Sequence, residues 1–184
     1  EAEGLTVDET AARIVEASPR LAAFCIYGHQ PSASTQCMPA ASAVAAEVKL
    51  MAQYTVTGNP IPMIALGTHP SALPQCTLRE EPFDYVCQGE GPYTIATMLA
   101  NAVIQAPGTV WSIPGLWGNA LPPWGTMNNI TDLDAELAGQ SWELLDMKRY
   151  RAHNWHLWTG AQKGGYASVQ TSLGCVFACQ FCCI

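Results

Sequence analysis

The stretch Leu21-Ala22-Ala23-Phe24-Cys25-Ile26-Tyr27 decides the fold, and it ends at Gly28. Side chains alternate between the two faces of a β-strand, so a strand with one face in water has a polar residue at every second position. This stretch has no charged residue on either face. We therefore predict a strand that is buried on both faces, as the strands of parallel sheets are.

Similar apolar runs follow further along the chain and alternate with segments that have helical character. The additional strands are predicted at 61–66, 85–87 and 110–113. Alternation of strands and helices is typical of an α/β fold. The expected architecture is a flavodoxin-like or Rossmann-like parallel sheet with helices covering it.

Start and stop signals set the expected bounds of the helices. Thr6 and Glu9 form a capping box for a helix that stops before Pro19. After a polar loop, Pro39 suits the first turn of a second helix, whose many small residues favour close packing on the sheet. A third helix is predicted at 93–105.

Composition excludes several classes of protein. The chain has 184 residues, a formal net charge of −7 and no cluster of Lys or Arg, which argues against a nucleic-acid surface. No apolar run reaches the roughly 18–20 residues that a membrane-spanning helix needs. Four of the eight cysteines crowd the last ten residues, unlike the spread cysteines of a secreted disulfide scaffold, so we expect a reducing cytoplasm. Glu1 and Ile184 both look like cut ends, and we expect a piece of a longer protein.

Three loops follow predicted strands and contain glycines, which let a backbone approach a bulky planar or phosphate-bearing ligand. In open parallel sheets, ligands bind at the carboxyl ends of the strands, where the strand order switches. These loops therefore predict a cofactor cleft, although they also fit the ordinary strand-to-helix turns of any flavodoxin-like domain. The candidate cofactor-binding residues are Gly28, Ser32, Ser34, Gly67, Thr68, His69, Ser71, Gly89, Glu90 and Gly91.

The strongest chemical signal is the run Cys175-Val176-Phe177-Ala178-Cys179-Gln180-Phe181-Cys182. A strand-like segment at 166–171 and a turn precede it. Three spaced thiolates can bind three irons of a 4Fe-4S cluster and leave the fourth iron open to another ligand. We therefore predict that Cys175, Cys179 and Cys182 bind a cluster, and that Cys183 does not.

Other interpretations of these cysteines stay open. They are a zinc knuckle, a disulfide pair and a second-cluster ferredoxin loop. Zinc would need a fourth ligand, and Cys183 is poorly placed to bind the same ion as its neighbour Cys182.

The cysteine run and its lead-in closely resemble the first strand and cluster loop of radical S-adenosylmethionine enzymes. The segment 67–74, with Asp84-Tyr85-Val86 and Gly89-Glu90-Gly91, resembles the late strands of the cobalamin-binding domain that precedes many of these enzymes' barrels. The resemblance implies a cobalamin-binding domain at 1–118 that lacks its first strand, a connector at 119–165, and the start of a truncated radical S-adenosylmethionine domain at 166–184.

The resemblance also implies a function for the longer protein. In this family the reduced 4Fe-4S cluster splits S-adenosylmethionine to a deoxyadenosyl radical that takes hydrogen from an unactivated carbon, and cobalamin often supplies a methyl group. The implied partners are a small-molecule substrate and an external electron donor of flavodoxin or ferredoxin type. Methyl transfer and ring formation are both compatible, and we expect the fragment alone to be inactive. The alternative is a non-catalytic flavodoxin-like ligand-binding domain with a structural metal-binding cysteine loop.

Four histidines are further candidates for metal binding. The cobalamin signature Asp-x-His-x-x-Gly is missing from these residues, and it would belong to a loop upstream of them. His29 and His69 lie in the candidate loops, but a lone loop histidine is more often a hydrogen-bonding residue than a metal ligand. His153 and His156 of the connector lack further ligands at a suitable spacing, and we interpret them as part of an aromatic packing segment.

Overall fold

The computed structural model of the chain describes residues 3–27, 31–54, 60–100, 113–118, 130–137, 139, 141–150, 167, 169, 177, 179 and 180. The chain divides into two compact units. One unit consists of residues 1–5 and 130–174, and the other of residues 6–129 and 175–184.

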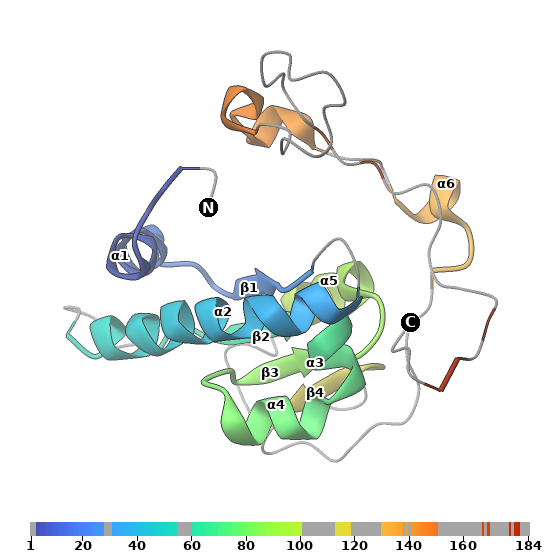
Figure 1. Ribbon diagram of the computed structural model, residues 1–184, viewed down its shortest axis with the longest axis horizontal. Helices are drawn as coiled ribbons and strands as arrows, with labels where there is room; N and C mark the ends of the chain where they lie inside the picture. The colour runs from blue at the N-terminus through green and yellow to red at the C-terminus, as the bar shows by residue number, and fades with distance from the viewer. Residues whose placement is uncertain are drawn as a thin grey trace. The chain divides into compact units, whose positions relative to one another are not determined.

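The larger unit is built on an open four-stranded sheet (Figure 1). Its strands are β1 (Ala22–Cys25), β2 (Met63–Leu66), β3 (Tyr85–Cys87) and β4 (Leu116–Gly118), in the spatial order β1-β2-β3-β4. β1, β2 and β3 are parallel, and β4 is antiparallel to β3. The predicted α/β fold is therefore confirmed, and the open, mostly parallel sheet is compatible with a Rossmann-like or flavodoxin-like fold, whereas the expectation that every strand is parallel is wrong for β4.

The fourth strand differs from its prediction. β4 begins at Leu116, whereas a strand was expected at 110–113, of which residues 110–112 lie outside the described residues. Gly115 has a φ of +75°, and an added Cβ there would collide with the backbone oxygen of Gln88. The turn that this glycine permits brings β4 back along β3 in the opposite direction.

The first helix, α1 (Val7–Ala17), has the predicted capping box. The backbone N–H of Glu9 donates to Thr6 Oγ1 at 3.2 Å, and the Glu9 carboxylate accepts from the backbone N–H of Thr6 at 2.8 Å. These bonds satisfy backbone donors that a helix start leaves unpaired. The sequence signal and the local structure agree here.

The second helix is longer than predicted. α2 spans Pro31–Ala52 and contains Pro39 in its interior, so the expected polar loop before Pro39 is wrong. Pro31 occupies the first turn instead, where a missing N–H costs nothing. Pro39 is exposed, so its ring projects away from the sheet. α2 is the longest described helix, and no helix among the described residues is long and apolar enough to cross a membrane.

The segments after β2 and β3 are helical. The predicted loop at 67–74 is mostly helix: α3 spans Thr68–Ala72 and α4 spans Pro74–Glu80. α5 spans Gly91–Ala100, and the rest of the helix predicted at 93–105 lies outside the described residues.

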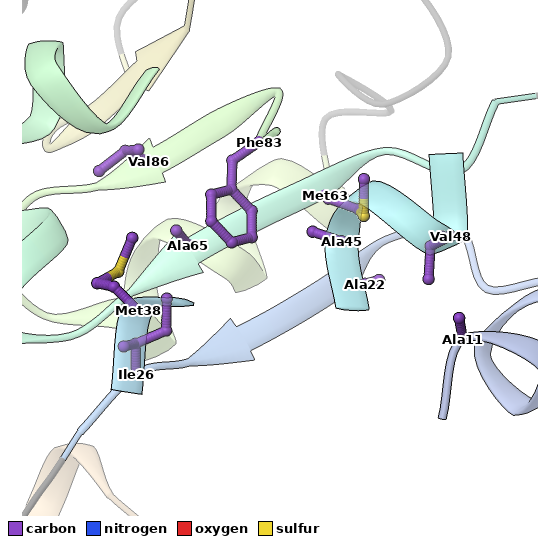
Figure 2. Close-up of a cluster of buried hydrophobic side chains, with 10 residues drawn as sticks. All are labelled: Ala11, Ala22, Ile26, Met38, Ala45, Val48, Met63, Ala65, Phe83 and Val86. Atoms are coloured by element: carbon purple, nitrogen blue, oxygen red, sulfur yellow. The ribbon is translucent and has the colours of Figure 1, made fainter. Parts of the chain in front are cut away.

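Two apolar clusters cover opposite faces of the sheet. On one face, α1 and α2 pack on Ala22, Met63 and Val86 together with Phe83 (Figure 2). On the other face, Met98 of α5 packs on side chains that include Ile64. Successive residues of β2 therefore point to opposite clusters, and all of β2 is buried. This is the burial that a continuous apolar run predicts for a central parallel strand.

β1 is buried on one face only. Ala22 and Ile26 belong to the apolar cluster under α2. Ala23 and Cys25 point to the opposite face of the sheet, where α5 packs on β2 and β3, and both are exposed there. The prediction that this stretch is buried on both faces is thus wrong for the described residues. β1 is the outermost described strand of the sheet, and α5 leaves Ala23 and Cys25 on this face exposed.

The smaller unit has short helical elements. α6 (Leu133–Glu136) is capped by Asp132, whose carboxylate accepts from the backbone N–H groups of Asp134 and Ala135 at 3.1 Å. The amphipathic segment that we expected in the connector forms two 3-10 helices, η2 (Trp142–Leu144) and η3 (Met147–Arg149). The assignment of 119–165 as a connector and of 166–184 as the start of a second domain stays a prediction.

We predict that Phe83→Ala lowers the free energy of unfolding by about 3 to 5 kcal/mol, because Phe83 is almost fully buried and packs edge-on against Phe24 with ring centroids 5.3 Å apart. Urea unfolding followed by circular dichroism measures this change. Tyr54→Ala is the control, because Tyr54 is 81% exposed, and it should shift stability by no more than about 0.5 kcal/mol. Equal losses in the two variants would contradict the assigned core.

Candidate functional site

The carboxyl ends of β1, β2 and β3 lie along one edge of the sheet, because the three strands are parallel. This edge brings together the predicted site residues that follow β2 and β3, and Ser34 near the start of α2. Gly28 and the side chain of Ser32 lie outside the described residues. The strand order among the described strands follows the sequence, so the expected switch in strand order is not found among them.

Ser34 joins the ends of β1 and β2. It is fully buried, and its hydroxyl donates to the backbone oxygen of Ile26, the residue after β1. The same hydroxyl accepts from the backbone N–H of His69 at 3.1 Å. The hydroxyl of Ser34 thus both donates and accepts a hydrogen bond within the chain, and these bonds hold α2 against the residues that follow β1 and β2.

Two further contacts hold the loops on this side. The ring Nδ1 of His69 lies 2.8 Å from Thr35 Oγ1, which fixes the imidazole against α2. The hydroxyl of Ser71 accepts from the backbone N–H of Gly89 at 2.9 Å and so joins α3 to the loop after β3. Thr68 is half-buried at the start of α3. Ser71 and His69 therefore have structural partners of their own.

The glycines at this edge serve close packing within the chain. Gly67 has a φ of +135°, and an added Cβ would overlap the backbone oxygen and carbon of Ile26. At Gly91 an added Cβ would lie 2.7 Å from Leu66 Cδ2, the movable end of a side chain. Gly89 has a φ of +89°, which L-residues rarely adopt. Packing of the chain on itself therefore accounts for Gly67, without any ligand.

A different group of side chains lies on the α5 side of the same edge. Cys25 is in register with Leu66, and the pairing of β2 with β3 places Cys87 on the other side of Leu66. Tyr27 lies two residues after Cys25, just beyond the end of β1, and is 53% exposed. Glu90 lies in the loop after β3 and is half-buried. These residues converge from β1 and β3 on one face.

The electrostatics of this group follow from burial without a compensating cation. Partial burial raises the pKa of Tyr27, and the nearby Glu90 carboxylate raises it further. Burial likewise raises the pKa of Glu90. Among the described residues, no hydrogen-bond donor or cation is paired with this carboxylate. Sequence analysis missed Tyr27, although its position at the end of the apolar run was a usable signal.

The predicted cluster cysteines are only partly described. Cys179 is exposed and has a free thiol, whereas Cys175 and Cys182 lie outside the described residues. His29, His153 and His156 lie outside them as well. Within the described part of the chain, no three metal-binding side chains come together. The metal site stays a prediction from the sequence.

A cavity of about 240 Å³ lies at the opposite edge, near the amino ends of β2 and β3. Lys49 Nζ and Asp84 Oδ1 form an ion pair of 3.0 Å at its wall. Asp84 Oδ2 also accepts from the backbone N–H of Met63 at 2.9 Å. The charges of this cavity are thus paired with each other or with the backbone, and the cavity is separate from the predicted site.

No protein-family model matches the chain, and no match is found among curated proteins or solved structures.

We predict that Gly67→Ala lowers the free energy of unfolding by more than about 2 kcal/mol, because the new Cβ meets rigid backbone at a positive φ. Gly91→Ala is the matched control, because its Cβ meets only the end of the Leu66 side chain at an ordinary φ. Its loss should stay under about 1 kcal/mol. Urea unfolding of the two variants makes the comparison, and equal stabilities would mean that Gly67 is not needed for packing.

Proposed function

We propose that the chain is part of a cobalamin-dependent radical S-adenosylmethionine enzyme. The observation that carries the proposal is the spacing of Cys175, Cys179 and Cys182, with a strand-like segment and a glycine turn before them. A site with three thiolates leaves one iron of a 4Fe-4S cluster open. The amino and carboxylate groups of S-adenosylmethionine are the ligands that this family uses there.

The exposed, free thiol of Cys179 fits a cluster ligand, because a ligand must be able to reach an incoming cluster. Cys175, Cys179 and Cys182 would hold the cluster, which would supply the electron transfer on which cleavage of S-adenosylmethionine depends. An external donor of flavodoxin or ferredoxin type would deliver the electron, in a reducing cytoplasm where the thiols stay unoxidised.

The cobalamin-binding role of the larger unit is proposed on its architecture. Its sheet is mostly parallel, and the segments that follow β2 and β3 begin at the carboxyl edge, where α/β domains bind cofactors. Glu90, which is half-buried in the loop after β3, is the polar side chain proposed to face the cofactor. When bound, cobalamin would supply methyl transfer or a related carbon-centred radical reaction on a small-molecule substrate.

The second candidate is a non-catalytic flavodoxin-like ligand-binding domain with a structural metal-binding cysteine loop. One observation favours it: Ser34, Gly67 and Ser71 each have a partner within the chain, as the ordinary turns of such a domain would. This candidate needs a fourth metal ligand beside the three spaced cysteines. The two functions thus differ in the number of protein ligands at the metal.

We predict that the chain, reconstituted anaerobically with iron and sulfide, binds about four irons and loses them in Cys175→Ala, Cys179→Ala and Cys182→Ala. Cys183→Ala is the matched control and should keep the cluster, because adjacent side chains in an extended segment point to opposite sides. Iron and sulfide counts and electron paramagnetic resonance of the reduced form are the measurements.

Two results of this experiment would count against the proposal. Loss of the cluster in Cys183→Ala would make the site a four-thiolate one without an open iron. Binding of one zinc ion per chain in place of iron and sulfide would favour the second candidate.

A further inference from the structure

We draw no further inference here: the strongest candidate, the cavity of about 240 Å³ that Lys49 of α2 and Asp84 line at the amino ends of β2 and β3, carries nothing, because these two charges are already paired with each other at 3.0 Å and nothing in the part of the chain that the structure describes shows what would bind there.

Discussion

The contact between Gly67 and the backbone of Ile26 fixes the carboxyl edge of the sheet. The N–H of Ile26 donates to Leu66 O at 2.7 Å, and its own oxygen accepts from the buried hydroxyl of Ser34. That hydroxyl in turn accepts from His69. Two strand ends and two helix starts thus meet around one peptide group, in a space that admits no Cβ at Gly67. The positions of α2 and α3 at these strand ends depend on this packing.

Much of this architecture could be predicted from local signals. Apolar runs predicted β1, β2 and β3, because a buried strand has no polar face, and the Thr6 and Glu9 pair predicted the start of α1. The start of α2 could not be predicted in the same way. Pro31 and Pro39 are both acceptable first-turn residues, and only the surrounding packing shows that the helix continues through the second proline. β4 was not predicted, because its antiparallel direction depends on the contact between Gly115 and Gln88, which are far apart in sequence.

The candidate site was predictable by position but not by role. Strand-end loops were expected to hold the site, and the parallel strands do bring those after β2 and β3 to one edge. The sequence could not distinguish a glycine that makes room for a ligand from one that makes room for the chain itself. Nor could it separate Ser34, whose hydroxyl is used twice within the chain, from Glu90, whose carboxylate is not. Such distinctions depend on partners that lie distant in sequence.

The two sides of the carboxyl edge therefore differ in what they offer a ligand. On the α2 side, the hydroxyls of Ser34 and Ser71 and one ring nitrogen of His69 are already engaged, so a ligand would have to compete with bonds that hold the loops together. On the α5 side, Glu90 lacks a partner among the described residues, and β1 exposes uncharged side chains. A ligand that binds there relieves an unfavourable carboxylate and covers apolar surface without breaking an existing contact. The α2 side of this edge is therefore held by contacts within the chain, whereas the α5 side leaves a carboxylate and uncharged side chains without such contacts among the described residues.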